Sequence, residues 1–142
     1  MKAWLACLLL LASLSAAGEE FPSRPVRILV GFTPGGGPDI TARFVAQRLS
    51  EKLGQQVIVE NRPGAGGTLA AAQVARSPAD GYTLLSVSSA HAAAAAIYAK
   101  LPYDTLKDLA GITQTASSKY VLVVPPSLGV RTAAVSGSLS RA

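Results

Sequence analysis

Three short, mostly apolar segments bounded by proline, glycine or polar residues organise the middle of the chain. They are residues 27–32, 56–60 and 82–87, and their length and composition are typical of strands buried in a sheet. After each of them the hydrophobic period changes to that of a helix. This alternation predicts right-handed crossovers and an α/β fold with a parallel sheet. Two further apolar stretches, residues 111–115 and 120–124, could extend that sheet.

The first predicted helix begins at Asp39, and its apolar residues recur every three or four positions. Gly54 follows the last of them, in the position where glycine commonly ends a helix. A second helix is expected from Thr68, which would be its N-cap, and the alanine-rich residues 91–98 predict a third. The apolar stripe of the first helix consists of Ala42, Val45, Ala46, Leu49 and Leu53, with Ile40 and Phe44 beside it.

The N-terminus departs from this pattern with a continuous apolar run after Met1 and Lys2. The charged start, the apolar run and its small-residue exit predict a cleaved signal peptide over residues 1–17, and therefore a periplasmic protein. A membrane span needs about 20 apolar residues, so an uncleaved anchor is the less favoured alternative. Cys7, the single cysteine, lies inside this run, and the cleaved chain would therefore contain no disulfide.

The charged residues add little to this picture. The chain has 13 Lys and Arg against 8 Asp and Glu, a formal net charge of +5, but the basic residues are spread singly. A nucleic-acid footprint needs clustered positive charge, so no nucleic-acid partner is expected. Residues 131–142 are small and polar, and we expect them to form a disordered tail after a folded unit that spans residues 18–130.

Two of the three predicted strand-to-helix turns are rich in glycine, at residues 35–37 and 64–67. In an open parallel sheet, ligands bind beyond the carboxyl ends of the strands, near a reversal of strand order. Glycine lets the backbone approach a ligand closely, and a helix start offers unpaired N–H groups with partial positive charge. The two turns therefore favour a small anion, with ligand-free tight turns as the alternative.

Known nucleotide-binding fingerprints do not fit these turns. The dinucleotide pattern requires glycine or alanine where Ile40 and Leu69 stand, and the phosphate-loop pattern requires Lys-Ser/Thr where Gly37 and Pro38 stand. A Gly-x-Ser-x-Gly elbow is also missing from the sequence. These mismatches disfavour the alternative of a small nucleotide-using enzyme, and we expect neither a cofactor nor catalysis.

Five polar residues near the turns are further candidates. Asp39 could accept a hydrogen bond from a ligand, or only stabilise the helix start. The hydroxyls of Ser86, Ser88 and Ser89 could donate to a carboxylate, or cap the following helix. His91, the single histidine, could face the same cleft, with a solvent-exposed helix start as the alternative. Without a cysteine partner it cannot build a zinc site of the usual type, so no metal is expected.

Five segments, in order along the chain, together resemble one family. They are Phe21-Pro22-Ser23-Arg24-Pro25-Val26-Arg27, Val30-Gly31-Phe32-x-Pro34-Gly35-Gly36-Gly37-x-Asp39, Val59-Glu60-Asn61-Arg62-Pro63-Gly64-Ala65-Gly66-Gly67, Pro78-x-Asp80-Gly81-Tyr82-Thr83-Leu84 and Lys100-Leu101-Pro102-Tyr103-Asp104. The chain is similar to the substrate-binding receptors of tripartite tricarboxylate transporters, the Bug-type periplasmic solute-binding proteins. The resemblance runs from the start of the mature chain to about Val130.

This resemblance implies a periplasmic-binding-protein-like fold, a parallel sheet with flanking helices in each of two lobes. The lobes close around a small carboxylate solute, and some receptors deliver it to the membrane subunits of a transporter. In the family the two glycine turns supply backbone donors to the ligand carboxylate. Carried over to this sequence, the ligand-binding positions are Gly36, Gly37, Asp39, Gly66, Gly67 and Thr68, with Ser86, Ser88 and Ser89 nearby.

Three departures from the family pattern bear on this expectation. Pro38 stands where the family often has a small hydroxyl residue, and alanines at residues 92–96 replace a stretch that usually carries an Asn-Pro pair. Family members are also more than twice as long as the mature chain. We therefore expect an incomplete first lobe, shortened by a frameshift or early stop, and a non-functional remnant of a receptor is the alternative to a working one.

Overall fold

A computed structural model describes residues 20–119, 121, 123 and 125–128 of the chain. The predicted signal peptide and the predicted tail lie outside these residues. The strands are β1 (Val26–Val30), β2 (Val57–Asn61) and β3 (Thr83–Ser86). The helices are α2 (Gly37–Leu53), α3 (Thr68–Ala75) and α4 (Ser89–Ile97), with short 3-10 turns η1 (Ala65–Gly67) and η2 (Pro126–Leu128).

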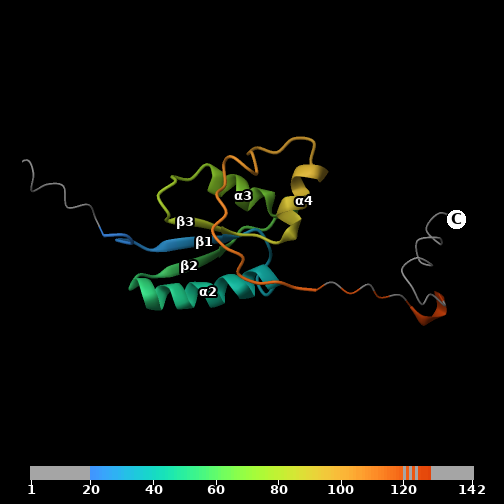
Figure 1. The fold of residues 1–142 in the computed structure, drawn as a ribbon, viewed down its shortest axis with the longest axis horizontal. Coiled ribbons are helices and arrows are strands. Elements are labelled where there is room, and N and C mark those ends of the chain that lie inside the picture. The colour runs from blue at the N-terminus through green and yellow to red at the C-terminus, as the bar shows by residue number, and fades with distance from the viewer. Residues whose placement is uncertain (1–19, 120, 122, 124, 129–142) are drawn as a thin grey trace, which may run out of the picture.

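The strands form a parallel sheet in the order β2-β1-β3. The chain passes from β1 through α2 to β2, and then from β2 through α3 across β1 to β3. Consequently α2 covers one face of the sheet, while α3 and α4 lie on the other (Figure 1). The predicted α/β class with a parallel sheet and flanking helices is confirmed. Within the described residues, no helix is long and apolar enough to cross a membrane.

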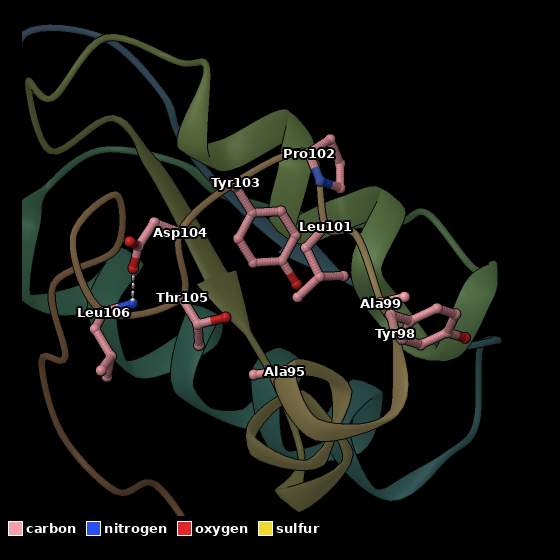
Figure 2. A pocket seen from close by; sticks show the side chains of 9 residues that line it. All are labelled: Ala95, Tyr98, Ala99, Leu101, Pro102, Tyr103, Asp104, Thr105 and Leu106. Atoms are coloured by element: carbon pink, nitrogen blue, oxygen red, sulfur yellow. Dashed lines mark hydrogen bonds between the residues drawn. The ribbon is translucent and has the colours of Figure 1, made fainter.

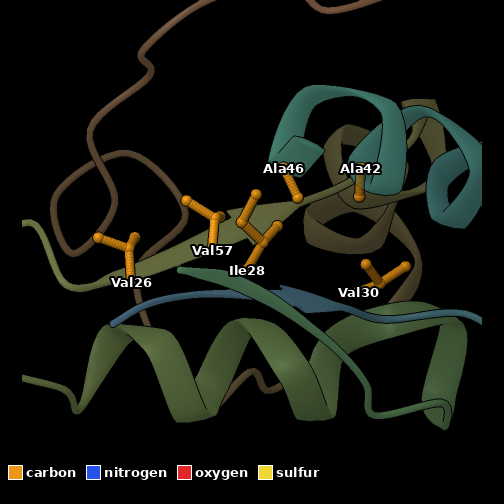
Figure 3. Packing of buried hydrophobic residues seen from close by; sticks show 6 residues of the cluster. All are labelled: Val26, Ile28, Val30, Ala42, Ala46 and Val57. Atoms are coloured by element: carbon orange, nitrogen blue, oxygen red, sulfur yellow. The ribbon is translucent and has the colours of Figure 1, made fainter. Parts of the chain in front are cut away.

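The main core lies between β1 and α2 (Figure 3). Alternate strand residues point to the same face, so Val26, Ile28 and Val30 pack together toward the small side chains of α2. Ala42 and Ala46 are buried there, as the helical stripe predicts, whereas Ile40 and Phe44 are 61% and 63% exposed. A second apolar cluster on the opposite face is built from Ala71, Ala72 and Tyr103.

The helix boundary at Gly54 is confirmed, because Gly54 has φ of 64° and its N–H donates to the Ser50 carbonyl. The prediction that residues 111–115 extend the sheet is wrong. They lie outside any strand with all their side chains exposed, and Ile112 is 77% exposed. Of residues 120–124, only Val121 and Val123 belong to the described part, and they too are exposed and outside any strand.

Candidate functional site

The strand order creates a switch point where β1 and β3 end side by side. Their following helices, α2 and α4, leave toward opposite faces of the sheet (Figure 1). The turn after β1 and the turn after β3 therefore meet at one edge of the sheet. A hydrogen bond joins them, because Ser86 Oγ donates to the Pro38 carbonyl at 3.3 Å. Such a switch point is where open α/β sheets bind their ligands.

A cavity of about 800 Å³ opens beside this contact. Four of the predicted ligand-binding residues line it, namely Gly37, Ser86, Ser88 and Ser89. Its floor is apolar, formed by residues such as Ile28, Ala42, Val45, Leu49 and Leu84, and the segment 112–118 forms another wall. None of the described residues that line the cavity carries a charge, so a ligand there would be held by backbone groups, hydroxyls and apolar contact.

The first glycine turn presents few N–H groups to this cavity. Gly36 is the N-cap of α2 and its carbonyl accepts from the N–H groups of Asp39 and Ile40. Pro38 has no N–H, so the turn loses one donor there. Within the described part of the chain, the N–H of Gly37 makes no hydrogen bond. It is therefore the backbone donor that this turn offers to a ligand.

Asp39 is buried inside the turn and its carboxylate is satisfied by the protein itself. One oxygen accepts from the Gly35 N–H at 2.9 Å and from Arg43 Nε at 3.0 Å, and the other from Asn61 Nδ2 at 2.8 Å. The hydrogen bonds from Arg43, Gly35 and Asn61, in that order, hold the pKa of Asp39 at about 2, against the opposing effect of burial. The predicted contact of Asp39 with a ligand stays a prediction, whereas its part in organising the turn is a direct observation.

The three serines differ in what they do. Ser86 bridges to Pro38 as described, and Ser88 is the N-cap of α4, with its hydroxyl accepting from the Ala90 N–H at 3.3 Å. The capping alternative is thus realised for Ser88. Ser89 is exposed in the first turn of α4 and lines the cavity.

The second glycine turn lies apart from this cavity. Gly66 is exposed with φ of 64°, but Gly67 and Thr68 are buried. The Gly67 N–H donates to the Gly64 carbonyl at 2.9 Å, and the Thr68 hydroxyl donates to the Ala65 carbonyl at 2.9 Å. The prediction of Thr68 as N-cap is wrong, because Gly67 holds that position and Thr68 is the first helical residue. The geometry brings Gly37 and the serines together but does not add Gly66, Gly67 or Thr68 to them.

His91 packs away from the cavity, against Tyr103. The two rings are stacked, with centroids 5.9 Å apart and planes at 3°, and burial lowers the pKa of His91. His91 thus lies in the first turn of α4, as the helix-start alternative predicts, but it is half-buried against Tyr103 instead of open to solvent. Beside it, a separate cavity of about 610 Å³ is lined by Ala95 of α4 and by residues that follow this helix, including Leu101, Tyr103 and Thr105 (Figure 2). None of the predicted ligand-binding residues lines it.

Sequence reasoning missed Asn61 and Arg43. Asn61 ends β2 and Arg43 lies one turn into α2, and both donate hydrogen bonds to Asp39. The signal was present, because the one asparagine of the sequence stands between an apolar strand and a glycine turn, and a part-buried amide there needs hydrogen-bond partners. Among the described residues, no group of three or more His, Cys, Asp or Glu side chains could hold a metal ion.

Comparison with known proteins gives the family. Residues 41–135 match the family described as "Tripartite tricarboxylate transporter family receptor". The chain belongs to this family. It is a family of solute-binding receptors rather than of enzymes. The resemblance predicted from the sequence motifs is thereby confirmed.

Individual relatives agree with this assignment. The chain is 40% identical over 114 residues to Protein BugT of Bordetella pertussis, a match that covers 79% of this chain and 35% of BugT. A solved structure described as a periplasmic transporter matches with a TM-score of 0.59 and 47% identity, over 62% of this chain and 30% of that one. MatC from Rhodopseudomonas palustris with bound malate matches with a TM-score of 0.57 and 42% identity, with the same coverage of 62% and 30%.

The coverage of these relatives is partial. The chain spans about a third of the length of the curated relatives that it matches.

Proposed function

We propose that this chain carries part of the solute site of a periplasmic receptor for small carboxylates. The observation that carries the proposal is the cavity at the carboxyl ends of β1 and β3, lined by Gly37, Ser86, Ser88 and Ser89. A carboxylate oxygen would accept from the Gly37 N–H at the start of α2, where the helix dipole favours negative charge. The remaining predicted positions would support the site by holding the two turns. They are Gly36, Asp39, Gly66, Gly67 and Thr68.

The chemistry of the cavity and of one relative support this ligand class. The Ser88 hydroxyl, which accepts from Ala90 and keeps its hydrogen to donate, and the Gly37 N–H are neutral donors, which suit a carboxylate without adding a fixed charge. MatC, which is 42% identical to this chain over the matched region, holds malate. Delivery of the solute to transporter membrane subunits, export by a cleaved signal peptide and the absence of catalysis belong to the same proposal. Affinity is expected to be modest, because a receptor of this kind gains affinity by enclosing its ligand between two lobes.

The proposal is tested by thermal denaturation of the chain with malate, citrate and an uncharged diol of similar length. A carboxylate at a hundredfold excess over its Kd should stabilise the folded state by about 2.7 kcal/mol, and the diol should not. A cooperative transition that no carboxylate shifts would contradict the proposal and favour the alternative of a non-functional remnant.

A pair of glycine variants locates the site. A Cβ on Gly37 would meet no atom within 4 Å, and the same holds for Gly111, which does not line the cavity. Gly37→Leu should therefore fold but block the cavity and abolish the response to malate, while Gly111→Leu should keep it. An unchanged response in Gly37→Leu would place any carboxylate site elsewhere.

A further inference from the structure

The side-chain amide of Asn61 makes its hydrogen bonds around the first glycine turn, although Asn61 itself lies at the end of β2. Its Nδ2 donates to Asp39 Oδ1 at 2.8 Å and to the Phe32 carbonyl at 3.1 Å. Its Oδ1 accepts from Arg43 Nη2 at 2.9 Å. Both amide hydrogens and the amide oxygen thus have partners, and those partners stand at the two ends of the turn that joins β1 to α2.

An asparagine side chain fits these three hydrogen-bond partners. Two of the partners are acceptors and one is a donor, so the position needs two donor hydrogens and one acceptor in a short planar group. An aspartate would set its own negative charge against Asp39 and the Phe32 carbonyl. An aliphatic side chain would leave the buried Asp39 oxygen without this donor, at a cost in free energy.

Asp39 connects Asn61 to the first glycine turn through hydrogen bonds to both. Its other carboxylate oxygen accepts from the Gly35 N–H at 2.9 Å, and Gly35 has φ of 84°, a conformation that few residues other than glycine adopt. Arg43, held by the same carboxylate at 3.0 Å, balances the negative charge that Asp39 would otherwise direct at an incoming anion. The side-chain amide of Asn61 and the Asp39–Arg43 ion pair therefore hold the turn together.

Asn61 also begins the second glycine turn. The residue after it, Arg62, donates its N–H to the Val30 carbonyl at 2.8 Å, so the chain stays paired to β1 as it leaves β2. We propose that Asn61 is a positioning residue, which acts through Asp39 to hold the first glycine turn in the conformation that presents the Gly37 N–H to the cavity. The presentation of the Gly37 N–H to a ligand rests on the proposed carboxylate site, whereas the effect of Asn61 on the turn does not.

The experiment compares the wild-type chain with Asn61→Ser and with the control Gln56→Ser, which shortens an exposed amide side chain just before the same strand. Carboxyl resonances of Asp39 and the amide resonance of Gly35 are followed by NMR from pH 7 downward. In the wild type Asp39 should titrate near pH 2. In Asn61→Ser its pKa should rise toward the usual 3.8, and the Gly35 amide should shift, whereas Gln56→Ser should leave both unchanged.

The same variants are then titrated with malate. Asn61→Ser should bind malate about tenfold more weakly at pH 7, since the turn has lost the hydrogen bonds of the Asn61 amide. The ratio of its affinity to that of the wild type should fall further at pH 4, where Asp39 of the variant begins to take up a proton. A general loss of stability would leave Asp39 with its low pKa in the folded fraction, so the titration separates positioning from a purely structural role.

Each outcome decides a separate claim. A wild-type chain that folds and ignores malate overturns the proposed carboxylate site, and the Asp39 titration still decides the role of Asn61. An Asn61→Ser variant with unchanged Asp39 and Gly35 signals overturns the positioning role. If Asn61→Ser does not fold, the wild type alone suffices, because Asn61 is the single asparagine and its side-chain NH₂ signal is told from those of the glutamines by its correlation to Cβ and Cγ. That signal must move together with the Asp39 carboxyl as the pH falls, and an independent response refutes the inference.

Discussion

Gly31 and Gly67 are in direct backbone contact. A Cβ built on Gly31 would fall 2.6 Å from the Cα of Gly67 and 3.1 Å from its carbonyl oxygen. Gly31 directly follows β1, and Gly67 ends η1 with φ of 93° and is buried. Through this contact the second glycine turn packs against the end of β1. The contact explains why Gly67 is buried and not accessible to a ligand.

Gly31→Ala should destabilise the chain, because the new methyl group collides with backbone atoms that cannot rotate away. Forcing an extra carbon into a packed site costs about 1–3 kcal/mol, and we expect a loss of this size in the free energy of unfolding by urea. Gly111→Ala is the matched control, since a Cβ there meets no atom within 4 Å. Equal stability of the two variants would show that the second turn moves away from β1 freely.

This contact also marks the limit of what the sequence predicts. The local signals were sufficient for the three strands, for the end of α2 at Gly54 and for the family, because each depends on neighbouring residues. The burial of Gly67 depends on Gly31, which belongs to another part of the chain, and no local pattern reports such a contact. The sequence therefore predicts a ligand contact at both glycine turns alike, whereas in the described structure only the first turn lines the cavity.

The wrong prediction for residues 111–115 has a similar origin. Residues 111–115 have the composition of a strand, but strand formation needs a partner with free backbone groups, and in the described structure these residues pair with none. The contact of Asp39 with a ligand stays a prediction, but the sequence alone does not show which groups satisfy its carboxylate. Its donors Arg43 and Asn61 come from α2 and β2, and only the assembled sheet brings Asn61 to it.

Tyr103→Phe should leave the fold intact and stabilise it. The hydroxyl of Tyr103 is buried and has no hydrogen-bond partner among the described residues, although the ring itself packs well against Ala71 and Ala72. A buried polar group without a partner costs about 1–3 kcal/mol, and removing the oxygen relieves part of that cost. We expect a rise in Tm for Tyr103→Phe and no comparable change for Tyr98→Phe, whose side chain is exposed. A lower Tm for Tyr103→Phe would reveal a partner for the hydroxyl.

His91 should make the stability of the chain depend on pH near neutrality. Burial against Tyr103 lowers the pKa of His91 below its usual value of 6.5, so in the window between the two pKa values the unfolded chain binds more protons than the folded one. Stability is then complete above about pH 7 and falls as the pH drops through 6.5 toward the lower pKa of the folded state. Because His91 is the single histidine, urea denaturation between pH 7.5 and pH 5 isolates its effect. The variant His91→Gln should have a flat profile over this range, and a wild-type profile equally flat would show that His91 is as easily protonated in the folded chain as in the unfolded one.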